Sequence, residues 1–223
     1  MQERLRIGMI VASSNTWAEP VTYRLLEEAP DVTVHFARVD IAAPSFTTAF
    51  GGEGMAQAAR QLADAEVEVI MWNGSSGSWL GIRRDEELSA ELSRICGVPA
   101  GTSTLALLES CRMHGVKRLG LVTPYSAEVN AEIAREYASV GIEVVAESHL
   151  GIQDNQGFSC VPEADLAREV RAVAPGADAA MILCTNLNGA FVAPLLEAEL
   201  GIPVFDSIAI TLSYALQLGS RDD

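Results

Sequence analysis

The chain has 223 residues, 49% of them hydrophobic and 20% charged, and 15 Lys and Arg against 30 Asp and Glu give a formal net charge of −15. This excess of acidic residues excludes a nucleic-acid-binding protein that depends on a basic surface. The apolar content suffices for a sizeable core, and no segment has the composition of a membrane span or a signal-peptide core. We therefore expect a soluble, cytoplasmic protein that binds neither nucleic acid nor membrane.

Strand-length apolar runs alternate with amphipathic helical stretches along the first half of the chain. In chain order, the sequence predicts a strand in RLRIGMIVAS, a helix over about 20–29, a strand in VTVHFARVD, a helix over about 54–65 and a strand in VEVIMWNG. Continuous apolar runs such as IGMIVA and AAMILC indicate strands that are buried on both faces, as in a parallel sheet covered by helices. The predicted fold class is α/β.

The second half of the chain repeats the plan of the first. RIGMIVASS at 6–14 aligns with RLGLVTPYS at 118–126, VEVIMWNGSS at 67–76 with ADAAMILCTN at 177–186, and GVPAGTS at 97–103 with GIPVFDS at 201–207. Buried strands resemble one another by chance, but three blocks in one order favour a duplication. We predict two similar, pseudo-symmetric lobes, each a parallel sheet flanked by helices. The first comprises residues 1–113 plus 208–223, whose helix packs back on it, and the second comprises residues 114–207.

Ligands of open parallel sheets bind beyond the carboxyl ends of the strands, so we expect the active site in the cleft between the lobes. Five loops end predicted strands there: 13–16, 74–78, 123–126, 184–186 and 206–207. All but the last are rich in neutral hydrogen-bond donors. Each alone could simply cap a helix, but together they can hold a carboxylate without Lys or Arg. The sequence thus predicts a small organic acid in a neutral, donor-rich cleft, whereas the lack of a phosphate-loop motif disfavours a nucleotide.

Cys184 is the candidate catalytic residue. It lies where the apolar run AAMIL stops and a Thr-Asn loop begins, and a helix N-terminus there would favour the thiolate. Such a thiol can transfer a proton at carbon or attack as a nucleophile, and an inert buried thiol is the alternative. Cys96 and Cys111 are expected to be inert, and the role of Cys160 stays open. No cysteine or histidine has metal-ligand spacing, so we expect no metal site.

Six segments in order resemble the aspartate/glutamate racemase superfamily, in its maleate cis–trans isomerase and arylmalonate decarboxylase branch. They are IGMIVASSNTWAEP (7–20), NGSSGSWLG (73–81), GVPAGTSTLALLESCRMHGVKRLGLVTPYSAEVN (97–130), GIQDNQG (151–157), ILCTNL (182–187) and GIPVFDS (201–207). The resemblance implies a duplicated fold in which racemases place one cysteine per lobe on opposite faces of the substrate. Cys184 matches the second-lobe cysteine, but the first-lobe position is Gly74, which can neither accept a proton nor add to a double bond.

A single second-lobe cysteine is the arrangement of the arylmalonate decarboxylases. By this resemblance, Ser75, Ser76 and Tyr125 hold the retained carboxylate and stabilise the enediolate left by carbon dioxide, and Cys184 protonates it without metal or organic cofactor. The expected catalytic residues are therefore Cys184 and Tyr125. The expected substrate-binding residues are Asn15, Gly74, Ser75, Ser76, Tyr125, Asn155 and Thr185.

Other features leave the reaction open. Asn15 and Asn155 look more like ligands of an isomerase's dicarboxylate, or they are ordinary turn residues. Ile41, Phe46 and Phe50 are candidates for an apolar pocket wall or for the core. We expect decarboxylation of a malonate-type acid. The alternatives are cis–trans isomerisation of a maleate-like acid, an Asp/Glu-type racemase, and a non-catalytic protein that binds an organic acid. An oligomer is compatible with the sequence.

Overall fold

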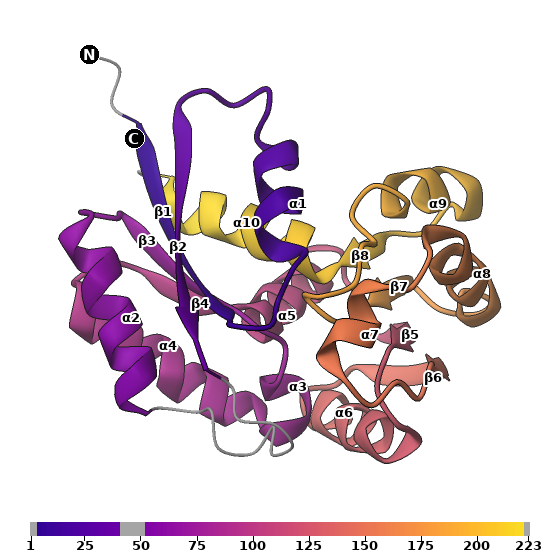
Figure 1. The fold of residues 1–223 in the computed structure, drawn as a ribbon. Coiled ribbons are helices and arrows are strands. Elements are labelled where there is room, and N and C mark those ends of the chain that lie inside the picture. The colour runs from indigo at the N-terminus through magenta and orange to yellow at the C-terminus, as the bar shows by residue number, and fades with distance from the viewer. Residues whose placement is uncertain (1–3, 41–51, 221–223) are drawn as a thin grey trace.

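The computed structural model describes residues 4–40 and 52–220, which form two four-stranded parallel sheets with helices on their faces (Figure 1). The first sheet has the order β2-β1-β3-β4 and the second β6-β5-β7-β8, so the two lobes share one topology and the predicted fold class is confirmed. The strands of the first sheet are β1 (Leu5–Ala12), β2 (Val32–Val39), β3 (Val69–Asn73) and β4 (Ala100–Thr102). Those of the second are β5 (Arg118–Thr123), β6 (Glu143–His149), β7 (Ala179–Ile182) and β8 (Val204–Asp206).

The helices lie on both faces of each sheet. The first half of the chain forms α1 (Ala18–Leu25), α2 (Glu53–Asp64), α3 (Gly77–Leu80), α4 (Ile82–Cys96) and α5 (Ser103–Met113). The second half forms α6 (Ala127–Ser139), α7 (Asn155–Ser159), α8 (Glu163–Val173), α9 (Ala193–Leu200) and α10 (Ser207–Gly219). The helix predicted over 20–29 is α1, and it ends at Leu25. Glu27 and Glu28 follow directly, and negative charge at a helix C-terminus is unfavourable.

The last helix of each half packs across to the other half. The chain leaves β8 into α10, whose Leu212 and Ala215 pack with Met9 and Met71 of the first sheet. Conversely, α5 follows β4, and its Leu107 belongs to the core that contains the strands of the second sheet. The two helices also contact each other. This exchange holds the lobes together, and the domain boundaries given above stay a prediction. Within the described residues, no helix is long and apolar enough to cross a membrane.

Candidate active site

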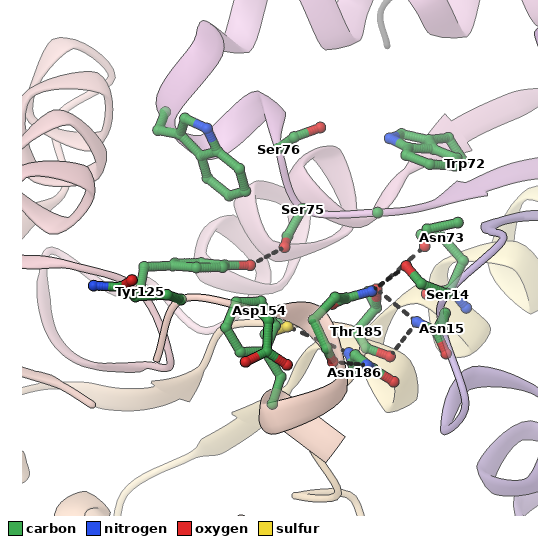
Figure 2. Close-up of a pocket in the computed structure, with 17 residues that line it drawn as sticks. Ser14, Asn15, Trp72, Asn73, Ser75, Ser76, Tyr125, Asp154, Thr185 and Asn186 are labelled. Carbon is green, nitrogen blue, oxygen red and sulfur yellow. Dashed lines mark hydrogen bonds between the residues drawn. The ribbon is translucent and has the colours of Figure 1, made fainter. Parts of the chain in front are cut away.

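A cavity of about 240 Å³ lies between the lobes at the carboxyl ends of the strands (Figure 2). Its volume is below the roughly 300–1,000 Å³ of sites for drug-sized ligands, which suits a small molecule. All the expected catalytic and substrate-binding residues line it, and the lining residues include members of β1 and β3, of the loops after β1, β3, β5 and β7, and of α7. The lining residues are Ala12, Ser14, Asn15, Trp72, Asn73, Gly74, Ser75, Ser76, Trp79, Tyr125, Gln153, Asp154, Asn155, Phe158, Cys184, Thr185 and Asn186.

The cavity wall is almost neutral. Among the described residues that line it, Asp154 is the only charged one, and its Oδ1 accepts the Gly157 amide at 2.7 Å, which caps α7. Arg38 is not among the lining residues, and its guanidinium donates to the carbonyls of Ser13 and Asn15 and pairs with Glu19. A bound acid would therefore be held by neutral donors, in a site where low polarity strengthens each hydrogen bond.

Cys184 lies in the loop after β7 and is only 4% exposed. Its amide donates to Ser207 Oγ at 3.0 Å, and the Asn186 amide donates to its Sγ at 3.3 Å. Burial raises the pKa of the Cys184 thiol to about 11, while hydrogen bonds from Asn186 and Tyr125 lower it and the charge of Asp206 raises it further. At neutral pH the group is a protonated thiol.

The expectation that a helix N-terminus favours a Cys184 thiolate is wrong. The next helix along the chain, α9, begins only at Ala193, nine residues after Cys184, and burial raises the pKa of the thiol. Loss of hydration on burial therefore raises the pKa of Cys184 by more than the local hydrogen bonds lower it. Gly189 lies in the loop after Cys184 and Pro194 in the first turn of α9, and these two residues are the sequence signal that the helix begins late.

Tyr125 contacts, through its hydroxyl, both Ser75, in the first-lobe loop 74–78, and the thiol of Cys184 in the second lobe. Its hydroxyl is 3.1 Å from Ser75 Oγ, as Figure 2 shows, and its ring lies against Trp79 and Phe158 with centroids 4.8 and 5.6 Å away. Burial and the neighbouring Cys184 hold the pKa of Tyr125 well above its usual range. The phenol is therefore neutral and keeps its proton available for donation.

Asn15 ties the first lobe to the second. Its Nδ2 donates to the carbonyl oxygen of Thr185 at 2.7 Å and contacts Thr185 Oγ1 at 3.3 Å, while its Oδ1 accepts the amides of Trp17 and Ala18. Thr185 Oγ1 in turn donates to the carbonyl of Asn73 at 3.2 Å. The polar atoms of Asn15 are thus engaged by protein groups, and its role in substrate binding stays a prediction.

Asn186 makes a second set of hydrogen bonds between the lobes, and the sequence alone did not single it out. Its Oδ1 accepts the Thr16 amide at 2.9 Å, and its Nδ2 donates to the carbonyl of Asn155 at 2.6 Å. Asn155 Nδ2 donates to Ser14 Oγ at 2.6 Å. The only sequence signal for Asn186 was its place two residues after Cys184, and nothing local pointed to its partners, Thr16 on the other lobe and Asn155 on its own lobe.

The strand registers place Gly74 and Cys184 at equivalent positions. Ile10 of β1 pairs with Trp72 of β3, and Val122 of β5, which aligns with Ile10, pairs with Ile182 of β7, so Gly74 and Cys184 each come two residues after the paired strand residue. Each loop then continues with residues that line the cavity, Gly74 and Ser75 in one lobe and Cys184 and Thr185 in the other. The two lobes therefore present different chemistry at matching places.

Trp72 and Asn73 also line the cavity and were missed from sequence because they continue the apolar strand. Within the described residues, Trp72 Nε1 and Asn73 Oδ1 are buried without a hydrogen-bond partner. Unpaired buried polar atoms are costly, so burial of these two lowers the stability of the fold.

The remaining candidate loops have structural roles. Ser126 caps α6, and Asp206 caps α10 by accepting the amides of Ile208 and Ala209 at 2.9 and 3.0 Å. Burial raises the pKa of Asp206 to about 7. Away from the cavity, burial raises the pKa of Cys111 to about 12. Ile41, Phe46 and Phe50 lie outside the described residues.

Comparison with known proteins agrees with this architecture. The sequence is 26% identical over 205 residues to an arylmalonate decarboxylase from Bordetella bronchiseptica, covering 90% of this chain and 85% of that protein. It is 25% identical over 232 residues to a maleate isomerase from Geobacillus stearothermophilus, covering 97% and 92%. A crystal structure of the maleate isomerase Iso from Pseudomonas putida S16 matches with a TM-score of 0.86 at 23% identity, covering 96% of this chain and 92% of that one. A crystal structure of arylmalonate decarboxylase matches with a TM-score of 0.82 at 24% identity, covering 98% and 94%.

The duplicated sheets and the cysteine in the cleft define an enzyme of the aspartate/glutamate racemase-like kind, in the branch of maleate isomerases and arylmalonate decarboxylases. The model of the arylmalonate decarboxylase family matches residues 37–222, and the chain belongs to that family. Family membership of this kind covers both decarboxylating and isomerising relatives, so the reaction has to be argued from the site.

Proposed function

We propose that this protein decarboxylates a malonate-type dicarboxylic acid without a cofactor. The observation that carries the proposal is one protonated thiol, Cys184, in a neutral cavity whose equivalent first-lobe position is Gly74. Such a site has one proton donor on one side of the substrate and no second acid–base group at the matching place. We also infer a cytoplasmic location, since its described cysteines are free thiols.

The retained carboxylate is held by neutral donors. Ser75 and Tyr125 are hydrogen-bonded to each other at the cavity wall, and Ser76 lines it beside them. These groups face the oxygens on which negative charge grows, which is where hydrogen bonds accelerate a reaction most.

The chemical step breaks the bond between the central carbon and the departing carboxylate. Its electron pair moves into the retained carboxyl group, carbon dioxide leaves, and an enediolate remains on the donors of the first lobe. Cys184 then gives its Sγ proton to the carbon, and the thiolate accepts the Asn186 amide and the Tyr125 hydroxyl until solvent returns the proton. A raised pKa suits this order, because the thiol stays protonated until the carbanion forms.

Cis–trans isomerisation of a maleate-like acid is the second candidate. The 25% identity to a maleate isomerase over 97% of the chain favours it, and a Nocardia farcinica maleate cis–trans isomerase has been seen with a covalently bound succinylcysteine intermediate. Addition of sulfur to a double bond needs a thiolate, which burial of Cys184 opposes.

Separate incubations with phenylmalonate, methylmalonate and maleate test the proposal, with carbon dioxide and fumarate measured. We expect carbon dioxide from a malonate, and its loss in Cys184→Ala. The matched control is Cys160→Ala, because that thiol is exposed and does not line the cavity. Fumarate that disappears in Cys184→Ala would establish the isomerase instead. Thermal stabilisation by the acids with no product in any incubation would identify a binding protein.

A further inference from the structure

The side chain of Trp72 occupies the space into which a side chain at position 74 would extend. A Cβ added to Gly74 would lie 2.7 Å from Trp72 Nε1 and closer still to Cε2 and Cζ2 of the same ring. Distances below 3.0 Å are essentially absent between real Cβ atoms and their neighbours. The indole of Trp72 therefore requires a glycine at position 74, so the absence of a thiol at this position has a steric cause.

Trp72 is held firmly in that place. It is the fourth residue of the five-residue strand β3, which pairs with β1 on one side and β4 on the other. Its side chain is 2% exposed and belongs to the core cluster that includes Ile10, Leu88 and Leu92. A ring packed in this way cannot swing aside cheaply, because close-packed cores resist changes of shape.

The same ring is part of the cavity wall. Trp72 lines the cavity together with Gly74 and Cys184, and Figure 2 shows its nitrogen on the edge of the ring nearer to Ser76. In the second lobe the position equivalent to Gly74 carries the thiol of Cys184. The duplicated fold therefore has a thiol on one lobe and an indole packed against a glycine on the other. An indole N–H neither accepts nor releases a proton near neutral pH.

We propose that Trp72 is a specificity-determining residue, whose indole excludes a second acid–base side chain from the first-lobe face and so restricts proton transfer to Cys184. This proposal rests on the proposed decarboxylation, because its chemical test measures the product of that reaction. A one-sided donor gives a single enantiomer when the product carbon is chiral, and it leaves that product unable to racemise. Trp72 then protects the stereochemical outcome against a side chain at position 74, although it takes no part in the proton transfer itself.

The test compares Gly74→Cys, Trp72→Leu and the double variant Gly74→Cys/Trp72→Leu. The substrate is methylphenylmalonate, and each enantiomer of its product, 2-phenylpropanoate, is followed in deuterated water for exchange and racemisation. We expect the double variant to racemise at least about tenfold faster than Gly74→Cys alone, because only the double variant has room for the new thiol. Trp72→Leu should still give a single enantiomer.

Thermal unfolding supplies a readout that does not require activity. Overpacking is destabilising, so Gly74→Cys should lower the melting temperature by about 2–12 °C when Trp72 is present. The same change should cost little or nothing in the Trp72→Leu background. Equal losses in both backgrounds would overturn the proposal, as would racemisation by Gly74→Cys that matches the double variant. If no variant decarboxylates, the proposed function fails while this thermal coupling still decides whether Trp72 excludes the side chain.

Discussion

Replacing Tyr125 with phenylalanine removes the hydroxyl that links the two halves of the site. That hydroxyl is hydrogen-bonded to Ser75 Oγ at 3.1 Å and lowers the pKa of Cys184 through a second hydrogen bond. The ring and its packing against Trp79 and Phe158 remain, so the change is confined to one donor. We expect the consequence to fall on the transition state, in which the carboxyl oxygens gain charge.

Loss of one such donor typically lowers kcat by about 10²–10³, which corresponds to about 3–4 kcal/mol. KM should change little, because the interaction strengthens only as charge develops. The cost in stability is smaller. Ser75 lines the cavity, so water can replace the lost partner, and we expect the low end of the about 1–3 kcal/mol for an unpaired buried group. For a chain of this size that is about 2–4 °C in melting temperature.

Tyr137→Phe is the matched control. Tyr137 is also buried and hydrogen-bonded to a serine, at 2.8 Å from Ser78 Oγ, but it does not line the cavity. The control should lose stability and keep its kcat, measured as carbon dioxide release at saturating malonate. A Tyr125→Phe enzyme with a kcat within about threefold of the wild type would refute the assignment of this hydroxyl to the transition state.

Three further predictions follow from the buried titrating groups. Since burial raises the pKa of Cys184 to about 11, kcat should stay level between pH 8 and pH 10, whereas a rate that climbs over this range would indicate a thiolate nucleophile. Iodoacetamide at pH 8 should modify the exposed Cys160 long before Cys184, as peptide mass mapping can show; rapid labelling of Cys184 would contradict the protonated thiol. Burial raises the pKa of Asp206 to about 7 from an ordinary 3.8, so the folded state binds the extra proton and stability falls as pH rises towards 7. Asp206→Asn should flatten the melting temperature between pH 5 and 8, and an unchanged slope would exclude Asp206 as its source.

The repeated strands and the loops that end them were predictable from the sequence alone. Parallel strands bring their carboxyl ends to one edge, so any residue just after a buried run is a candidate for the site. This local rule placed Gly74, Ser75 and Cys184 on one cavity. It also paired Gly74 with Cys184, because the strands on either side repeat in order and the observed registers agree.

Side-chain direction and burial were not predictable in the same way. Trp72 reads as one more apolar strand residue, and its contact with Gly74 depends on how the chain turns after β3. The pKa of Cys184 depends on how much protein covers the sulfur and on where α9 begins, neither of which a strand pattern contains. The partners of Asn186 come from residues more than 30 positions away in the chain, so short-range reasoning had no access to them.

Cys184 and the serine hydroxyls of Ser75 and Ser76 sit on opposite lobes, so their separation depends on the contacts that join the lobes. Asn15 makes one of these contacts through Nδ2, and Asn15→Asp removes that donor while keeping the oxygen that accepts the amides of Trp17 and Ala18. The start of α1 should therefore survive, whereas the Thr185 carbonyl would face a carboxylate oxygen in place of an N–H group.

If Asn15 acts by positioning, Asn15→Asp should lower kcat by about tenfold or more with a modest change in KM, because small misplacements of reacting groups are costly. If Asn15 instead binds the substrate directly, the added negative charge should raise KM steeply for every dicarboxylic acid. The comparison with Asn15→Ala separates these outcomes, since alanine also removes the tie to Thr185 without placing a charge beside the ligand. A rise in KM confined to Asn15→Asp, with kcat unchanged in both variants, would show that the tie between the lobes does not set the geometry of the proton transfer.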